Sequence, residues 1–142
     1  MLKMANSCRK IQAVVIRKRD GKEVLLVHYT PPKSYWETIT GNVNRNESIE
    51  EGLKRELMEE ISLGGAQLIK TSYLSSFEYE KNENHYKEDI FMIEVSSNFI
   101  PDIGHNPDGE HNAYGWFSSG EALKLVPWQE MRDSIVKALS SD

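Results

Sequence analysis

Apolar residues occur along the chain in short runs that are separated by polar segments. The first two runs, at residues 11–18 and 23–29, are rich in β-branched side chains, which favour extended strands. Asp20 and Gly21 stand between them, and an Asp-Gly pair between two apolar runs is a strong signal for a tight hairpin turn. The sequence therefore predicts that these two strands lie side by side and antiparallel.

A four-residue repeat marks the expected helix, which spans residues 48–61. An apolar residue recurs at every fourth position from 49 to 61, and this spacing places all of them on one helical face. Ser48 and Glu51 have the spacing of a capping box, in which each side chain bonds the backbone of the other residue. The glycines at 64–65 follow the last turn, so we expect them to make the tight turn out of the helix.

The remaining elements are expected from shorter patterns. Strand-like segments lie at 36–40, 66–80, 88–95 and 113–117, and a second helix is expected within 128–139. Strands before, between and after two helices predict a layered α/β fold in which helices cover a mixed sheet. No repeats, low-complexity tracts or flexible linkers divide the chain, so residues 1–142 are expected to form a single domain.

Composition and charge narrow the class of protein. Residues 1–33 hold eight Lys or Arg against two acids, yet the whole chain carries a formal charge of −5, so the remainder is strongly acidic. An extended nucleic-acid interface needs a broad basic face and is disfavoured here, whereas a small phosphorylated ligand is compatible with the basic N-terminal third. Cys8 is the one cysteine, which excludes an internal disulfide, and no apolar run is long enough for a membrane span. We expect a cytoplasmic protein that binds neither nucleic acid nor membranes.

The acidic residues of the predicted helix fall into two groups, of which the first needs no function. Glu50 precedes Lys54 by four residues, and Glu51 precedes Arg55 by four. This is the favourable orientation for surface ion pairs worth about 0.2–0.5 kcal/mol each. We therefore expect both acids to form such pairs on the exposed face of the helix.

The second group is Glu56, Glu59 and Glu60, which share about a third of the helix circumference. They lie near the C-terminal end, where the helix dipole disfavours an anion by about 0.3–1 kcal/mol. Arg55 lies one turn before Glu59, but no basic residue follows within reach. Either solvent and salt screen these carboxylates, or they bind a hard divalent cation such as Mg²⁺, which prefers oxygen ligands.

The segment around these acids, "GNVNRNESIEEGLKRELMEEISL", resembles the signature of the Nudix hydrolases. The signature positions that it matches, at the required spacing, are Gly41, Glu47, Arg55, Glu56, Leu57, Glu59, Glu60 and Leu63. The chain departs from the signature at Ser62, where the family has glycine, and at residues 39–40, where many members carry Pro-Gly. Neither departure removes a carboxylate.

The resemblance implies a fold and a chemistry. Family members have an α/β/α sandwich with a mixed central sheet, and they hydrolyse a nucleoside diphosphate linked to another moiety. They use Mg²⁺, with Mn²⁺ as a second possibility, to bridge carboxylate and phosphate oxygens. The metal ligands implied for this chain are the side chains of Glu56, Glu59, Glu60 and Glu110, together with the backbone carbonyl of Thr40 or Gly41.

The resemblance also implies which residues take part in catalysis. Glu56 and Glu59 belong to the catalytic set, and Arg55 is expected to orient a carboxylate, since its guanidinium stays protonated. Members of the superfamily differ in which glutamate accepts the proton from water, so Glu56 and Glu110 are both candidates for the general base. Glu47 is assigned a structural role, in which it closes the loop against Arg55.

Segments outside the signature, "YWETITG" and "GEHNAYGWFSSGEALKLVPW", are most similar to the dihydroneopterin triphosphate pyrophosphatases, a subgroup also associated with dATP hydrolysis. His111, next to Glu110, is a candidate for contact with phosphate. Aromatic residues outside the signature form the pool for binding the base or pterin, and they are Tyr35, Trp36, Phe77, Tyr79, Tyr86 and Trp128. For most of them, packing in the core is the alternative role.

The function expected from the sequence is thus Mg²⁺-dependent hydrolysis of a nucleoside or pterin triphosphate to the monophosphate and pyrophosphate. The protein is expected to act on this small molecule as a monomer or homodimer. A second hypothesis keeps the chemistry with another substrate, such as a dinucleoside polyphosphate, a nucleotide sugar or an oxidised nucleotide. A third is a Nudix-like domain that binds a nucleotide without cleaving it, and the intact "RELMEE" argues against that.

Overall fold

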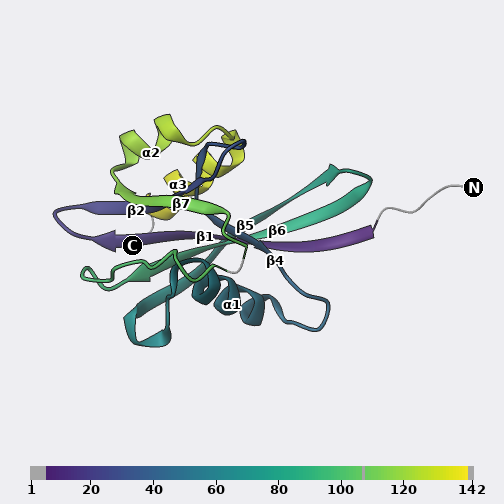
Figure 1. The fold of residues 1–142 in the computed structure, drawn as a ribbon, viewed down its shortest axis with the longest axis horizontal. Helices are drawn as coiled ribbons and strands as arrows, with labels where there is room; N and C mark the ends of the chain where they lie inside the picture. The colour runs from purple at the N-terminus through teal and green to yellow at the C-terminus, as the bar shows by residue number, and fades with distance from the viewer. Residues whose placement is uncertain (1–5, 107, 141–142) are drawn as a thin grey trace, which may run out of the picture.

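The computed structural model describes residues 6–106 and 108–140, within which seven strands form one mixed sheet with helices on both faces (Figure 1). The strands are β1 (Asn6–Lys18), β2 (Lys22–Tyr29), β3 (Trp36–Glu37), β4 (Ile39–Asn42), β5 (Leu68–Lys81), β6 (Asn84–Val95) and β7 (His111–Phe117). The helices are α1 (Ile49–Ile61), α2 (Ser119–Leu125) and α3 (Gln129–Ser140), and a 3₁₀ turn, η1, spans Gly65–Gln67. The predicted α/β class with a mixed sheet is therefore confirmed.

Strands β1 and β2 separate near the middle of the sheet, and the strands inserted between them position the functional residues. β1 pairs with β6 in parallel, while its pairing with β2 is antiparallel and extends only from Ile16 to Lys18. Beyond this hairpin the two strands diverge, and β3 and β4 fill the space between them, β3 against β2 and β4 against β1. Residues 36–42 therefore lie at the centre of the sheet.

Two hydrophobic clusters hold the layers together. Val15 and neighbouring residues of the sheet pack against Leu57 and Ile61 of α1 on one face. Val14 and Ile16 point the opposite way, as alternate residues of a strand must, and pack under α3 against Ile135. Figure 1 shows α1 on one side of the sheet and α2 and α3 on the other. Burial on both faces explains why β1 is apolar without alternation.

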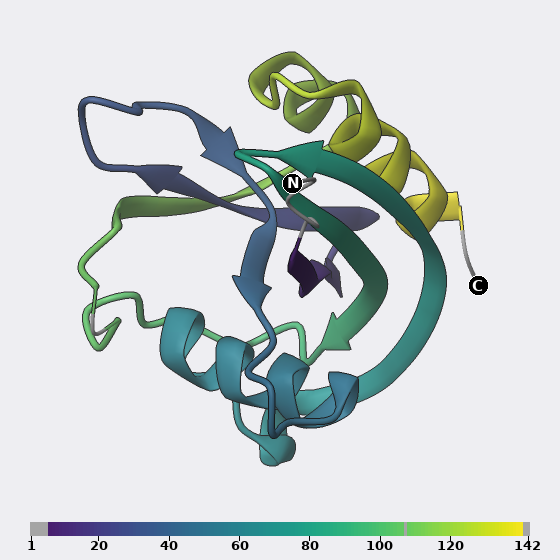
Figure 2. The same ribbon diagram turned by 90° about the vertical axis from the view of Figure 1, so that its right-hand side faces the viewer.

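The structure extends some predicted elements and adds one. β5 and β6 form a long hairpin that curves around the core (Figure 2). Its turn contains Asn82 and Glu83, both with positive φ, inside the segment expected to be a loop. The short helix α2 was not predicted, although Ser118 caps it by accepting a hydrogen bond from the backbone N–H of Glu121. None of the helices in the described residues is both long and apolar enough to cross a membrane.

The ends of α1 confirm one prediction and correct two. Ser48 and Glu51 form the expected capping box, with both reciprocal hydrogen bonds present. The predicted pairing of Glu51 with Arg55 is wrong, because Glu51 is engaged in this cap and Arg55 binds other acids. The glycines at 64–65 do not make the turn out of the helix, since Ser62 itself adopts the left-handed conformation, with φ 57° and ψ 36°.

Candidate active site

Arg55 lies at the centre of the acidic face of α1. Its Nε donates to Glu47 over 2.6 Å, and Nη1 donates to Glu56 over 2.9 Å and to Glu59 over 3.1 Å. Its Nη2 donates to the backbone carbonyl of Asn42, the last residue of the central strand β4, over 2.7 Å. A planar guanidinium can bridge several acceptors in this way, so Arg55 fixes the three carboxylates relative to the sheet. The predicted contact between Glu47 and Arg55 is present.

Glu56 points from α1 toward the backbone of β4. A β-carbon placed on Gly41 would lie 2.1 Å from Cδ of Glu56 and 2.4 Å from its Oε2, well inside van der Waals contact. The glycine at the start of the signature therefore leaves room for a carboxylate at the sheet surface. Because the backbone of Thr40 and Gly41 passes directly beside this carboxylate, the fold brings the predicted carbonyl ligands to the predicted acid.

Glu60 lies one turn further along α1 and contacts one residue from the loop before β7 and the first residue of β7 itself. The Asn106 side-chain amide donates to Glu60 Oε2 over 2.6 Å, and His111 Nδ1 lies 2.9 Å from the same oxygen. The other ring nitrogen of His111 is 3.9 Å from Glu37 on β3. The side chain of His111 is only 3% exposed, so the imidazole is enclosed between two carboxylates.

These surroundings shift the pKa values of the buried groups. Burial raises the pKa of Glu56 to about 7; the hydrogen bond and charge of Arg55 oppose this, and the charges of Glu60 and Glu59 add to it. Burial lowers the pKa of His111, but Glu37 and Glu60 outweigh that effect and raise it to about 9. The charged imidazolium thus balances part of the negative charge that the acids place here.

The donor set fits a hard divalent cation. Glu56 and Glu60 are 8% and 6% exposed, and carboxylates held so close together out of water are destabilised unless a positive charge joins them. Mg²⁺ prefers oxygen ligands and normally takes few from the protein, completing its shell with water and phosphate. In the part of the chain that the structure describes, no three His, Cys, Asp or Glu side chains are grouped closely enough to hold a metal ion by themselves. A cation here would therefore need oxygen ligands from water or a bound phosphate in addition to the carboxylates.

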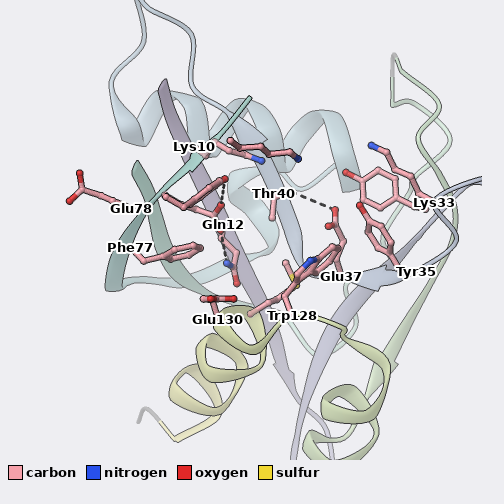
Figure 3. A pocket seen from close by; sticks show the side chains of 15 residues that line it. Lys10, Gln12, Lys33, Tyr35, Glu37, Thr40, Phe77, Glu78, Trp128 and Glu130 are labelled. Carbon is pink, nitrogen blue, oxygen red and sulfur yellow. Dashed lines mark hydrogen bonds between the residues drawn. The ribbon is translucent and has the colours of Figure 1, made fainter. Parts of the chain in front are cut away.

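A cavity of about 560 Å³ lies on the side of the central strands that faces α3, with Trp128, Glu130 and Met131 in its wall (Figure 3). Figure 3 shows Phe77 and Glu78 on one side of it, Tyr35 and Lys33 on the opposite side, and Trp128 entering from the start of α3. This volume is in the range of small-molecule sites. The residues that line it are Lys10, Gln12, Tyr29, Lys33, Tyr35, Glu37, Thr40, Phe77, Glu78, Tyr79, Lys81, Glu88, Trp128, Glu130 and Met131.

The structure divides the predicted aromatic pool. Tyr35 and Trp128 line the cavity and pack edge to face, with ring centroids 4.5 Å apart. Phe77 and Tyr79 line it from β5 in a stacked pair with centroids 5.4 Å apart. Trp36 instead packs on Phe117 and on the hydrophobic cluster under α3. Tyr35, Phe77, Tyr79 and Trp128 are thus the aromatic side chains placed to contact a ligand in the cavity.

Glu110 stands just before β7, where its backbone anchors the loop. Its carbonyl oxygen accepts hydrogen bonds from the backbone N–H of Thr30, over 2.8 Å, and from the Thr30 hydroxyl, over 2.6 Å. The charge of Glu110 contributes to the raised pKa values of Tyr29 and Tyr35, after burial and Glu37. Glu110 therefore lies at the Tyr29 end of the cavity, while its neighbour His111 reaches Glu60.

Three polar residues of the site were not predicted from the sequence. Glu37 is 4% exposed and connects His111 to the cavity, and Gln12 and Glu88 are buried in the cavity wall. Glu37 and Gln12 fall within segments predicted as strands, and Glu88 opens another. The only sequence signal for these residues is a polar side chain within an apolar strand. That signal does not show whether the side chain points into a cavity or toward solvent.

Comparison with known proteins gives a family match over most of the chain. Residues 9–139 match the NUDIX domain family. The dihydroneopterin triphosphate diphosphatase of Haemophilus influenzae is 28% identical over 138 residues, which cover 89% of this chain and 84% of that protein. The bis(5'-nucleosyl)-tetraphosphatase (asymmetrical) of Rattus norvegicus is 28% identical over 128 residues, covering 88% and 76%.

Comparison with solved structures shows the same architecture. A binary complex of the Ap4A hydrolase of C. elegans aligns with a TM-score of 0.76, covering 92% of this chain and 93% of that one. The two sequences are 20% identical, so this likeness concerns the fold alone.

Proposed function

The chain belongs to the Nudix family of hydrolases, and from that premise we propose that it is a Mg²⁺-dependent pyrophosphohydrolase of nucleoside or pterin triphosphates. The observation that carries the proposal is the position of Glu56, which lies against Gly41, with Glu60 one turn away. Through His111 and Glu37, Glu60 is linked to a cavity large enough for a base or pterin ring. The products are the monophosphate and pyrophosphate.

The carboxylates of Glu56, Glu59 and Glu60 hold the cation, with Glu110 and the carbonyl of Thr40 or Gly41 as further ligands. When bound, Mg²⁺ or Mn²⁺ neutralises phosphate charge and acidifies a water molecule. Without it, these carboxylates repel a polyphosphate, so binding of the substrate depends on the cation. Arg55 holds Glu56 in place, and Asn106 and His111 hold Glu60.

The residues around the cation site hold and move protons. Arg55 orients Glu56 and Glu59 and stays charged throughout. Glu56, which Arg55 holds in place beside Gly41, is the first candidate for the general base. Glu110 is the second candidate, since it directly precedes His111, which reaches Glu60. His111 places an imidazole between Glu60 and Glu37 and is close enough to the site for phosphate contact.

The cavity supplies the binding site for the ring. Tyr35, Phe77, Tyr79 and Trp128 present aromatic faces for a planar ring. Three lysines, Lys10, Lys33 and Lys81, also line the cavity, together with four glutamates. The relative from Haemophilus influenzae is named for dihydroneopterin triphosphate, which favours a pterin or purine triphosphate as the substrate class. We place the enzyme in the cytoplasm, as a monomer or homodimer that acts on small molecules.

A second candidate keeps the chemistry and changes the substrate to a dinucleoside polyphosphate. The rat tetraphosphatase is as similar in identity as the bacterial relative, and this supports the alternative. A non-catalytic binding domain is disfavoured, because all three helix carboxylates and Arg55 are present and mutually placed.

Product analysis tests the proposal. The protein is incubated with dATP, dGTP, dihydroneopterin triphosphate and Ap4A, each with Mg²⁺ or with a chelator, and the products are identified by mass. The proposal predicts monophosphate and pyrophosphate from a triphosphate, with Mg²⁺ only. Cleavage of Ap4A alone would support the second candidate, and saturable binding without cleavage of any compound would support a binding domain.

A further inference from the structure

Glu88 and Gln12 form a polar pair deep in the cavity, away from the acidic face of α1. They lie on the neighbouring parallel strands β6 and β1 and are 5% and 1% exposed. Gln12 Nε2 donates to Glu88 Oε2 over 2.8 Å, and the Tyr79 hydroxyl donates to Glu88 Oε1 over 3.3 Å. Each oxygen of this carboxylate is therefore fixed in position by one protein donor.

The buried pair of Glu88 and Gln12 would destabilise the fold if it served only as a structural contact. Both donors to Glu88 are neutral, and taking a carboxylate out of water with neutral partners alone is unfavourable. Burial raises the pKa of Glu88 above its usual range, against the opposing effects of the Gln12 hydrogen bond and the charge of Lys10. A carboxylate has about four acceptor positions, so two remain after these contacts. A ligand with N–H donors in the cavity would use them.

We infer that the Glu88 carboxylate binds the edge of the substrate ring and selects a 2-amino-4-oxopyrimidine, the unit shared by guanine and the pterins. The inference rests on the proposed function, since it names the ring that the triphosphate carries. Gln12 and Tyr79 act as positioning residues, because they hold the carboxylate in place.

The chemistry of the ring edge gives the selectivity. A 2-amino-4-oxopyrimidine presents a ring N–H beside an amino N–H, and two adjacent donors match the two oxygens of a carboxylate. Adenine presents an amino group beside a ring nitrogen that carries a lone pair. That lone pair would face Glu88 and be repelled, so adenine loses one hydrogen bond and gains an unfavourable contact.

The rest of the cavity accommodates such a ring. Phe77, Tyr79 and Trp128 line it with aromatic faces on which a planar heterocycle can stack. Glu37 and Thr40 also line the cavity, and Glu37 is linked through His111 to Glu60 on the acidic face of α1. In Figure 3, Gln12 lies between Phe77 on one side and Glu37 on the other. In the proposed binding mode, the phosphates extend from a ring at Glu88 past Glu37 toward the proposed cation site.

The test compares GTP with ITP, which lacks only the 2-amino group. Steady-state kcat/KM is measured with Mg²⁺ for the wild type, Glu88→Gln and the control Glu94→Gln, which changes a glutamate of the same strand that pairs with Lys18 outside the cavity. Binding of the α,β-methylene analogues of both nucleotides is followed separately by tryptophan fluorescence. We expect the wild type and the control to prefer guanine about tenfold in both assays, and Glu88→Gln to lose the preference.

The outcomes separate the inference from the proposed function. Cleavage of triphosphates with equal kcat/KM for GTP and ITP, or a preference for dATP, would overturn the inference and leave the proposed function intact. A preference retained in Glu88→Gln would also overturn it, as would failure to bind or cleave GTP, dGTP and dihydroneopterin triphosphate. Selective binding of the guanine analogue without any hydrolysis would support the inference while refuting the proposed function. If Glu88→Gln fails to fold, the ratio of kcat/KM for GTP to that for ITP in the wild type still tests the inference, because a ratio near one would overturn it.

Discussion

The Glu56 carboxyl group packs directly against the backbone of Gly41, since a β-carbon on residue 41 would lie 2.1 Å from the carboxyl carbon of Glu56. The contact joins the central strand β4 to the acidic face of α1. It makes the glycine at the start of the signature a steric requirement of the carboxylate, because no side chain fits in the space that Glu56 occupies.

Replacing Gly41 by alanine is expected to abolish most activity while the fold survives. The Glu56 side chain is flexible and can swing away from the added methyl group, so stability changes little. A displacement of about 1 Å at a reacting group can cost about 100-fold in rate, and we expect a loss of that size in kcat. Gly120→Ala is the matched control, because no atom lies within 4 Å of a β-carbon there. A Gly41→Ala enzyme as active as the control would show that Glu56 is not needed at this position.

Arg55→Lys should distinguish the effect of the positive charge at position 55 from the effect of the hydrogen-bond geometry of the guanidinium. Lysine keeps the positive charge but cannot donate to Glu47, Glu56 and Glu59 together. We expect kcat to fall at least about tenfold and the free energy of unfolding to drop by about 1 kcal/mol. The control is Arg17→Lys, which alters the remote pair with Glu23. Equal kcat values in the two variants would contradict the orienting role of Arg55.

The tip of the β5–β6 hairpin should respond to pH through His85. Its ring nitrogens lie 2.5 Å from Glu80 and 2.7 Å from Glu78, and these hydrogen bonds raise the pKa of His85 above its usual 6.5, while Lys87 lies near Glu78. A raised pKa means that the contact stabilises the fold fully below pH 6.5 and loses this contribution as pH rises through the folded-state pKa.

An NMR titration of the histidine rings checks this expectation. The His85 resonance should titrate above pH 6.5 in the wild type and return toward 6.5 when Glu78 and Glu80 are both replaced by glutamine. The melting temperature of the wild type, relative to that of the double variant, should be higher at pH 5.5 than at pH 9. An unshifted His85 in the wild type would refute the contact.

Ser62→Gly should stabilise the protein slightly without affecting activity. Ser62 holds the left-handed conformation that glycine adopts freely, at a cost of about 1 kcal/mol for other residues. Its hydroxyl recovers part of that cost by donating to the carbonyl of Asp102 over 3.1 Å. We expect a net gain of about 0.5 kcal/mol in thermal unfolding. Ser62→Ala, which keeps the strain and loses the hydroxyl, should be less stable than the wild type, and the opposite ranking would contradict this account.

Much of α1 could be predicted because its signals are local. The four-residue repeat and the capping box of Ser48 and Glu51 lie within the helix itself, and both were confirmed. The partners of the acids were not local. Glu60 is bound by Asn106, in the loop before β7, and by His111, at the start of β7, so spacing along the helix could not identify them.

The cavity was harder to predict for the same reason. Gln12, Glu37 and Glu88 are brought together by the divergence of β1 and β2 and by the parallel pairing of β1 with β6. Parallel strands are far apart in the sequence and are not joined by a tight turn, so no local sequence signal predicts that they pair. The prediction that glycines 64–65 make the turn out of α1 was wrong because the preference of glycine for left-handed backbone is only statistical. Ser62 adopts that conformation instead, and its hydroxyl forms a compensating hydrogen bond.

The central claim is that Glu56, Glu59 and Glu60 bind the cation on which hydrolysis depends. Isothermal titration of Mg²⁺ or Mn²⁺, run beside a turnover assay, tests it with Glu60→Gln and the control Glu50→Gln, an exposed acid at the other end of the same helix. We expect Glu60→Gln to weaken cation binding at least about tenfold and lower turnover about 100-fold, with the control unchanged. Equal cation affinity and turnover in the two variants would contradict the claim.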